Sequence, residues 1–267
     1  DRMKRIGMLT SGGDCQALNA AMRGVVKTLA NGKEEVEIYG FLDGYRGLIY
    51  GNFRMLTDKD FSGILTKGGT ILGTSRTPFK TIQDPDPNGL NKVEAMKQNY
   101  YKLQLDCLVI LGGNGTHKTA NLLRKEGLNI VTLPKTIDND LIQTDHTPGY
   151  ASAAKYVAAS VREIALDASV YQQKAVTIVE LMGRHAGWLT AASALARKFE
   201  GDNPVLIYLP EADFELEQFA KDLKAALEKQ NSVVVCVSEG ISDASGTFIC
   251  EYGDEAMIDN FGHKMLT

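Results

Sequence analysis

Two segments of the chain combine glycines with their neighbours in a way that could hold a phosphate group. In residues 9–14, and again in residues 111–116, an apolar run leads into glycines and then into a helical stretch. Glycine lets backbone N–H groups approach an anion, and a helix N-terminus adds partial positive charge. The pattern is equally typical of a tight turn between a strand and a helix. Two such loops at one edge of a sheet would favour a phosphate site, because open α/β sheets bind ligands there.

The second loop matches neither of two common phosphate-binding motifs. Lys118 does not directly follow a glycine, as a Walker A loop requires. The same lysine occupies the place of the third glycine of a dinucleotide-binding motif. The phosphate hypothesis therefore depends on the two loops together.

A third segment, residues 134–140, carries several groups that could do chemistry. Lys135, Thr136, Asp138 and Asp140 lie in it, directly after an apolar run. Their oxygen atoms would suit a metal ion or a hydroxyl substrate, and the lysine would help to neutralise a transferring phosphoryl group. A solvated turn rich in Asp and Asn would look similar. We favour a functional loop, because these groups are dense and follow a predicted strand.

Three single charged residues are further candidates. Arg184 and Glu239 follow apolar strand-like runs, and Arg76 lies in a loop of glycine and threonine. Arg76 could clamp an anion, although a lone arginine is more often a surface residue, and Arg184 at a strand end is in a better position. The four histidines show no spacing typical of a metal site.

Short apolar runs alternate with longer helical stretches along the chain. Most runs are apolar on both faces, which is typical of parallel strands covered by helices on both sides. The predicted strands are residues 5–10, 36–41, 107–111, 129–133, 175–181, 205–209 and 232–238. The predicted helices are residues 18–30, 116–126, 151–166, 188–198 and 216–230. This order predicts an α/β fold with a mainly parallel sheet. We also expect residues 77–91 to form an exposed polar loop and residues 134–148 to form a hinge between two domains.

Composition excludes several classes of protein. The 267 residues include 29 Lys and Arg against 33 Asp and Glu, a formal net charge of −4, so no nucleic-acid partner is expected. No apolar run approaches the ~20 residues that span a bilayer, and the N-terminus lacks a signal-peptide pattern. The four cysteines form no CxxC pair, and Cys107 and Cys236 fall in predicted strands. We therefore expect a reduced, cytoplasmic protein without a membrane partner.

From these residues a phosphotransferase is the leading hypothesis. A nicotinamide-dependent oxidoreductase and a small-molecule binding module with two α/β lobes are the alternatives. The segment with Asp138 and Asp140 discriminates between them, because phosphoryl transfer needs metal-binding carboxylates and a base. A magnesium requirement in an activity assay would separate the three.

The three loops, in this order and with several other segments, closely resemble the 6-phosphofructokinase family. The matching segments are residues 10–14, 19–21, 40–47, 68–76, 112–116, 136–140, 182–184 and 238–240. Members of this family transfer a phosphoryl group from ATP or pyrophosphate to the 1-hydroxyl of fructose 6-phosphate in glycolysis, with Mg²⁺. The resemblance implies two α/β lobes with mainly parallel sheets flanked by helices, an active site in the cleft, and a homodimer or homotetramer.

The resemblance also implies roles for individual residues. The catalytic residues would be Asp138, as the general base, with Thr136, Asp140 and Lys135. The donor-binding residues would be Gly12, Tyr45, Arg76, Gly113, Asn114, Gly115 and Thr116. The sugar phosphate would be held by Thr136, Asp138, Met182, Gly183, Arg184 and Glu239. Mg²⁺ would be held by Asp138 and Asn114.

Lobe boundaries follow from the same resemblance. We expect residues 1–140 and 254–267 to form the phosphoryl-donor lobe and residues 141–253 to form the sugar-phosphate lobe. Family members continue past the position of Thr267 with a segment that adds arginine and histidine to the sugar-phosphate pocket. We therefore expect the C-terminal part of the family fold to lie outside this sequence.

The choice of phosphoryl donor depends on a few positions. Gly115 resembles ATP-using members, in which no side chain blocks the nucleotide. Lys135, Asn114 and the segments 144–149 and 183–189 are more similar to the pyrophosphate-using branch. Asn114 stands where ATP-using members usually carry a magnesium-binding aspartate, and an amide is a weaker Mg²⁺ ligand than a carboxylate. These features favour pyrophosphate as the donor, with ATP as the alternative.

Overall fold

The computed structural model describes residues 2–252, 257–258 and 264–265. The chain divides into two compact units, Asp1–Thr136 and Ile137–Thr267. The division falls shortly before the predicted boundary at residue 140 and assigns Asp138 and Asp140 to the second unit. The predicted return of residues 254–267 to the first lobe falls largely outside the described residues and stays a prediction.

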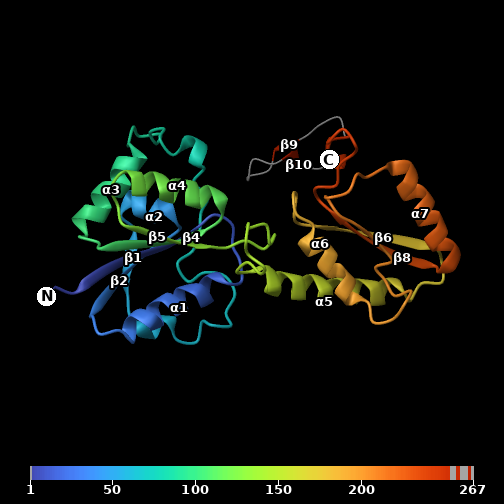
Figure 1. Ribbon diagram of the computed structural model, residues 1–267, viewed down its shortest axis with the longest axis horizontal. Coiled ribbons are helices and arrows are strands. Elements are labelled where there is room, and N and C mark those ends of the chain that lie inside the picture. The colour runs from blue at the N-terminus through green and yellow to red at the C-terminus, as the bar shows by residue number, and fades with distance from the viewer. Residues whose placement is uncertain (1, 253–256, 259–263, 266–267) are drawn as a thin grey trace. The chain divides into compact units, whose positions relative to one another are not determined.

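A five-stranded sheet with the order β3-β2-β1-β4-β5 forms the centre of the first unit. Its strands are β1 (Lys4–Ser11), β2 (Val36–Phe41), β3 (Phe53–Leu56), β4 (Cys107–Gly112) and β5 (Ile130–Pro134). Neighbouring strands are parallel, except that β2 and β3 are antiparallel. The carboxyl ends of β1, β4 and β5 therefore lie together at one edge of the sheet (Figure 1).

Helices cover both faces of this sheet. They are α1 (Leu18–Ala30), α2 (Tyr45–Tyr50), α3 (Lys92–Lys102) and α4 (Asn114–Lys125). Figure 1 shows α1 on one face and the other three on the opposite face. Because side chains alternate along a strand, Met8 and Val109 pack in the cluster beside α1, whereas Leu9 and Ile110 pack in the cluster beside α2, α3 and α4. Full burial of each such side chain is worth about 1.5–3 kcal/mol, so both faces contribute to holding the strands in register.

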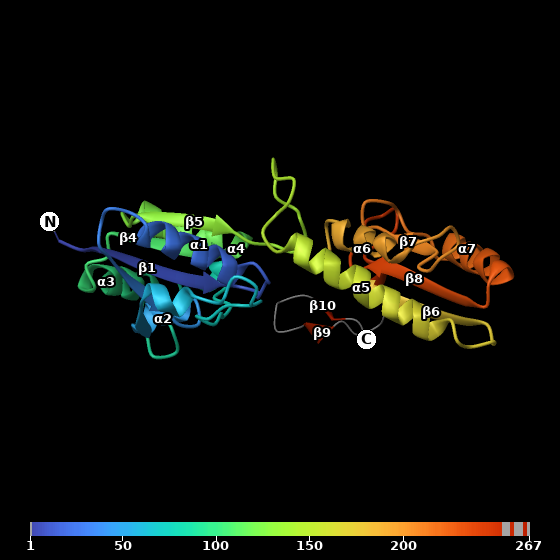
Figure 2. The same ribbon diagram turned by 90° about the horizontal axis from the view of Figure 1, so that it is seen from below.

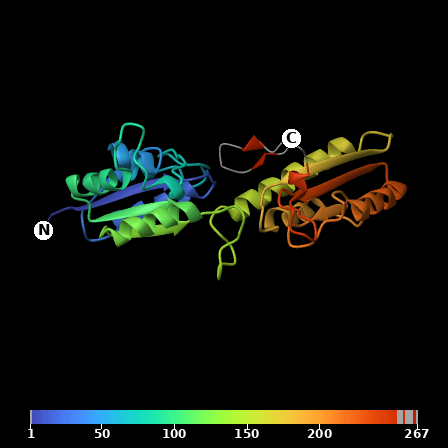
Figure 3. The same cartoon turned by 90° about the horizontal axis from the view of Figure 1, so that it is seen from above.

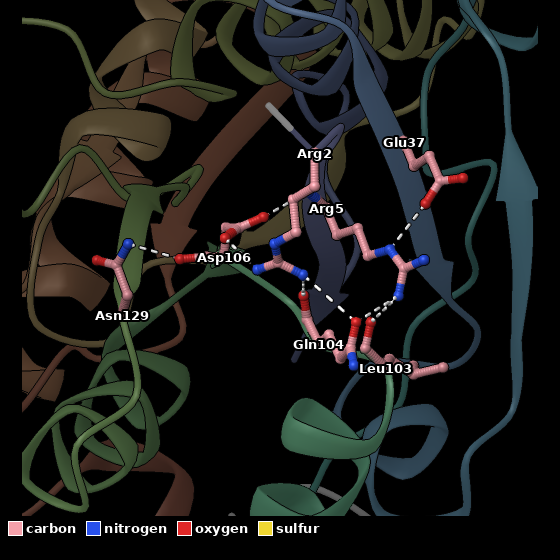
Figure 4. Close-up of polar contacts among 7 residues, drawn as sticks. All are labelled: Arg2, Arg5, Glu37, Leu103, Gln104, Asp106 and Asn129. Carbon is pink, nitrogen blue, oxygen red and sulfur yellow. Dashed lines mark hydrogen bonds and ion pairs between the residues drawn. The ribbon is translucent and has the colours of Figure 1, made fainter.

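The opposite, amino-terminal edge of the sheet is held by polar contacts (Figure 4). Arg2 pairs with Asp106 at 2.7 Å, and Arg5 pairs with Glu37 at 3.0 Å. Asn129 donates from its Nδ2 to the carbonyl oxygen of Asp106 at 2.8 Å. Exposed pairs of this kind add only about 0–1 kcal/mol each. They join neighbouring strands at this edge, and the loops that could bind a phosphate lie at the opposite edge.

The second unit contains a three-stranded parallel sheet with the order β6-β8-β7. Its strands are β6 (Ala175–Leu181), β7 (Leu206–Tyr208) and β8 (Ser232–Ser238), and its helices are α5 (Tyr150–Ala168), α6 (Trp188–Ala192) and α7 (Leu216–Lys229). Helices α5 and α6 lie on one face of this sheet (Figure 2), and Val234 and Cys236 of β8 pack with residues of both. Helix α7 lies on the other face (Figure 1) and runs alongside β8 (Figure 3). There Tyr208 of β7 contacts Phe219 of α7, with ring centroids 5.5 Å apart.

All seven predicted strands are present, and the α/β fold with mainly parallel sheets is confirmed. The prediction missed α2, α3 and the antiparallel edge strand β3. It also extended α6 too far, because Ser193–Ala196 continues as a 3₁₀ turn. The expectation of an exposed loop at residues 77–91 was wrong in part: Ile82 is buried in the core beside α3, and Asp86 is buried too.

Cys107 and Cys236 lie in β4 and β8, as predicted. No disulfide joins the four cysteines, all of which lie in the described ranges. Among the helices that the structure describes, none combines the length and the apolar character needed to cross a membrane.

Candidate active site

Strand register brings three of the predicted loops together in the first unit. Ser11 at the end of β1 pairs with Gly112 at the end of β4, and Gly112 pairs with Pro134 at the end of β5. Gly12, Gly113 and Lys135 therefore follow directly from adjacent strands at the same edge. The backbone N–H of Lys135 also donates to the carbonyl oxygen of Gly112 at 3.1 Å. This edge is where open α/β sheets bind ligands.

Gly12 fastens a fourth segment to this edge. Its backbone has φ +91°, a conformation that glycine adopts without strain. Its N–H donates to the carbonyl oxygen of Ser75 at 3.1 Å, and Thr74 donates from its Oγ1 to the carbonyl oxygen of Gly12 at 2.6 Å. These two bonds hold residues 74–75 against the loop and so carry the following residue, Arg76, to the same place.

Two cations converge on Gly13. A β-carbon at this position would lie 3.5 Å from an Nη of Arg76 and 3.6 Å from Nζ of Lys135. Both side chains thus border the space that the glycine leaves open. Burial raises the pKa of the neighbouring Cys15 thiol, and the positive charge of Lys135 offsets part of that rise. The loop combines backbone N–H groups with two positive charges, the chemistry that binds a phosphate.

Helix α4 begins at this edge, and contacts of Thr116 hold its first turn in place. Thr116 donates from its Oγ1 to the carbonyl oxygen of Ser11 at 3.1 Å. A β-carbon on Gly112 would lie 2.5 Å from the Thr116 side chain, so only glycine fits there. Tyr45 donates its hydroxyl to the carbonyl oxygen of Thr116 at 2.7 Å.

The structure modifies the role expected for Tyr45. This side chain is fully buried, and burial raises the pKa of its hydroxyl far above the usual range. A buried hydroxyl that already donates to α4 supports the helix and does not face a ligand. Asn114 and Gly115, by contrast, are exposed in the first turn of α4. Nothing lies within 4 Å of a β-carbon placed on Gly115.

The predicted base lies in a loop of the second unit. Asp138 is half-buried and Asp140 is exposed, and Ile137 packs against the core beside α5. Between the two carboxylates, Asn139 is buried with φ +55°. Its Oδ1 accepts from the N–H of Thr147 at 2.8 Å, and its Nδ2 donates to the carbonyl oxygen of Asp145 at 3.1 Å. Asn139 therefore closes the loop and fixes the backbone that carries both aspartates.

A second loop of this unit holds the residues predicted to bind the sugar phosphate. It follows β6 and contains Met182, Gly183 and Arg184. Gly183 has φ +116° and donates its N–H to Oε1 of Glu239 at 3.0 Å. An Nη of Arg184 lies 4.0 Å from Oε2 of the same glutamate, and its guanidinium lies 5.6 Å from the centroid of the Phe248 ring.

The end of β8 is packed against the backbone of this loop. A β-carbon on Gly240 would lie 1.7 Å from the carbonyl oxygen of Arg184. Ser238 donates from its Oγ to the carbonyl oxygen of Gly183 at 2.7 Å. Desolvation, and then the nearby charge of Glu239, raise the pKa of Glu180 at the end of β6. The exposed Met182 and the half-buried Arg184 are thus presented by a backbone that side chains and glycines hold in place.

Of the two residues predicted to bind Mg²⁺, Asn114 belongs to the first unit and Asp138 to the second. In the described ranges, no group of three His, Cys, Asp or Glu side chains forms a metal cage.

The first unit holds all the residues predicted to bind the donor, namely Gly12, Tyr45, Arg76, Gly113, Asn114, Gly115 and Thr116, together with the predicted catalytic residues Lys135 and Thr136. The second unit holds the other predicted site residues, namely Asp138, Asp140, Met182, Gly183, Arg184 and Glu239. These roles stay predictions. Sequence reasoning did not assign roles to Asn139, Phe248 or Glu211, whose carboxylate contacts the backbone of Gly187. Asn139 carried a signal, because asparagine tolerates positive φ better than most residues.

Comparison with known proteins identifies the family of the chain. The family described as Phosphofructokinase matches residues 5–265. An ATP-dependent 6-phosphofructokinase of Spirochaeta thermophila is 47% identical over 246 residues, which cover 89% of this chain and 64% of that relative. A pyrophosphate–fructose 6-phosphate 1-phosphotransferase of Amycolatopsis methanolica is 37% identical over 265 residues, covering 98% of this chain and 72% of that protein. The chain thus spans less than two thirds of the Spirochaeta relative.

A solved structure gives the same answer for the fold. The pyrophosphate-dependent phosphofructokinase of Marinobacter aquaeolei matches with a TM-score of 0.74 and 27% identity. The match covers 90% of this chain and 62% of the other. Since the matched residues run through both units and every loop described above, the chain belongs to the phosphofructokinase family.

Proposed function

We propose that the chain transfers the terminal phosphoryl group of ATP to the 1-hydroxyl of fructose 6-phosphate. The observation that carries this proposal is the convergence of Arg76 and Lys135 on Gly13, beside the N-terminus of α4. Two cations and a helix N-terminus at the carboxyl edge of a parallel sheet suit a polyphosphate. A nicotinamide-dependent oxidoreductase or a simple binding module would not need this concentration of charge.

The groups of the proposed donor site would bind the negative charge of the donor phosphates and leave space for a nucleotide. Backbone N–H groups at Gly12 and in the first turn of α4 would hold donor oxygens, and Arg76 offers bidentate hydrogen bonds to phosphate. The open space at Gly115 supports a nucleotide, because an α-phosphate and ribose could lie close to its backbone. Positive charge near the transferring group stabilises the charge that spreads over its oxygens in the transition state.

On the acceptor side, Asp138 would take the proton of the 1-hydroxyl as that oxygen attacks the phosphorus atom. A general base must reach the proton within hydrogen-bond distance, and the closed loop around Asn139 supports a fixed position for Asp138. Asp140 and Thr136 would orient the reacting groups. Arg184 would hold the 6-phosphate, while Glu239 keeps its loop in place.

Magnesium would be held by Asp138, by Asn114 and by donor phosphate oxygens. When bound, it would neutralise the donor phosphates and polarise the phosphoryl group.

Pyrophosphate, which the sequence features favoured, is now the second candidate donor. The 47% identical Spirochaeta relative is named ATP-dependent, and the Amycolatopsis relative that is named for pyrophosphate is only 37% identical. One specific observation still favours pyrophosphate: Nζ of Lys135 lies at the glycine loop, 3.6 Å from the β-carbon position of Gly13. There it would neutralise the end of a short donor. The homodimer or homotetramer and the cytoplasmic location stay predictions.

A donor comparison tests the proposal. The purified 267-residue chain is given fructose 6-phosphate and Mg²⁺ with either ATP or pyrophosphate, and fructose 1,6-bisphosphate is measured. We expect product with ATP and a higher kcat/KM for ATP than for pyrophosphate. A higher value for pyrophosphate would reverse the choice of donor. Because the chain spans only 64% of the Spirochaeta relative, the same assay is run on a chain extended to the full family length, and no product from either chain with either donor would contradict the proposed function.

A further inference from the structure

Two different carboxylates hold the loop of residues 182–187, which is proposed to bind the sugar phosphate, by accepting hydrogen bonds from two of its glycines. Glu239 accepts the N–H of Gly183 at 3.0 Å, and Glu211 accepts the N–H of Gly187 at 2.6 Å. Both glycines are buried, so each carboxylate satisfies a donor that water does not reach. Arg184 lies on the loop between the two anchors. Glu239 belongs to a family motif, whereas Glu211 lies after β7 and outside every segment that the sequence singled out.

Gly187 and Glu211 fit each other closely. A β-carbon on Gly187 would lie 2.5 Å from Oε2 of Glu211 and 2.9 Å from Cδ of Pro210. The carboxylate therefore occupies the space that a side chain at residue 187 would need. Hydrogen bonds from a backbone N–H to a carboxylate are shorter and stronger than neutral ones, and this one also stands at the start of α6, where negative charge is favoured.

We infer that Glu211 is a positioning residue for fructose 6-phosphate, acting through the backbone of residues 183–187 to fix Arg184. This inference rests on the proposed function. Glu211 itself does not touch the sugar phosphate: its Oε1 holds one end of the loop, as Oε1 of Glu239 holds the other. A phosphate-binding arginine on a loosened loop would lose the geometry that makes its contacts effective.

Three variants test the role. Glu211→Ala removes the acceptor, Glu211→Gln keeps an oxygen that can accept the Gly187 N–H, and Asp202→Ala is the matched control. Asp202 accepts the N–H groups of Lys198 and Phe199, both at 2.9 Å, in the same unit but on another loop. We expect Glu211→Ala to raise the KM for fructose 6-phosphate about tenfold, with kcat and the donor KM within about twofold. Glu211→Gln and Asp202→Ala should stay within about twofold of the unmodified chain in every constant.

A second measurement needs no substrate. Amide hydrogen exchange of the peptide that contains residues 182–187 should become faster in Glu211→Ala and not in Asp202→Ala. If both variants lower the melting temperature alike, and neither changes the KM or the exchange of this loop, Glu211 is only structural and the inference is overturned. If neither the unmodified chain nor a chain of full family length binds or turns over fructose 6-phosphate, the proposed function fails, while the exchange result still decides whether Glu211 holds the loop.

Discussion

The first unit encloses its sheet on both faces, whereas the second leaves part of one face open. In the first, Ile110 is fully buried and both faces carry a cluster of buried residues. In the second, one face packs on α5 and α6, but Val176 and Ile178 of β6 remain 37% and 58% exposed on the other. None of the described residues of α7 is buried.

The two units consequently position their functional groups in different ways. The proposed donor loops of the first unit are placed by strand register and by glycines, because Ser11, Gly112 and Pro134 pair side by side. The proposed substrate loops of the second unit depend more on hydrogen bonds between backbone groups and the single side chains Asn139, Glu211 and Glu239. The sheet of the second unit is less completely covered and gives its loops less packing support. Specific polar contacts therefore hold part of the loop backbone.

The largest effect should come from the acceptor side. We expect Asp138→Asn to lower kcat by about 10²–10⁴, because this change removes the proposed general base. Binding of fructose 6-phosphate should stay within a few-fold, since an amide has nearly the same size and shape. A rate assay over a range of pH, together with a fructose 6-phosphate titration, measures both quantities. Near-normal turnover would show that Asp138 is not the general base, and the proposed mechanism would then lack one.

A matched pair of core substitutions tests the difference between the two sheets. Ile110→Ala should destabilise the first unit by about 2–5 kcal/mol, because it leaves a cavity in a filled core. Ile178→Ala, in mid-strand on the open face of β6, should cost less than about 1 kcal/mol. Denaturant unfolding followed by circular dichroism measures both. Equal losses would mean that the β6 face is covered in solution, and the contrast between the units would then disappear.

The strands were predictable because of their composition. Runs such as Val233 to Val237 are short, rich in valine and apolar on both faces, which is typical of buried parallel strands. The missed elements lack this signal: α3 has a mostly polar sequence with only three buried residues, Ala95, Met96 and Tyr100, and β3 is a short antiparallel edge strand.

The candidate site, like the fold, could be predicted from the sequence only in part. Loops that follow strands could be placed together from the sequence, because parallel strands end at one edge. The roles of Tyr45 and Glu211 could not, since each depends on a contact with a distant part of the chain. Tyr45 meets Thr116, 71 residues away, and Glu211 meets Gly187, 24 residues away. Periodicity and motif spacing carry no information about such pairs.

A third prediction concerns the charge at the donor loop. Lys135→Met should lower kcat/KM for pyrophosphate by about 10–100-fold, as expected from losing hydrogen bonds to a charged group worth about 1.5–3 kcal/mol. The loss with ATP should be smaller, because a nucleotide makes further contacts. Lys118→Met is the control, because Lys118 is an exposed lysine of helix α4, and it should change kcat/KM for neither donor. Equal losses for both donors would show that Lys135 does not discriminate between them.

A fourth prediction concerns donor preference at Gly115. An aspartate there would fill the open space in the first turn of α4 and place a negative charge beside a polyanion. Pyrophosphate is short and need not pass this position, whereas ATP would bring its α-phosphate and ribose close to it. Gly115→Asp should therefore shift the ratio of kcat/KM for pyrophosphate to that for ATP toward pyrophosphate by about 1–3 kcal/mol.

The control for this prediction is Gly24→Asp, an exposed glycine of α1 with equally open space around its β-carbon position. The same new charge at residue 24 should leave the donor ratio unchanged, because no donor loop lies there. If both variants shift the ratio alike, the effect belongs to the net charge and not to the nucleotide path. If Gly115→Asp leaves the ratio flat or moves it toward ATP, Gly115 does not border the nucleotide, and the first unit places its donor by Arg76 and Lys135 alone.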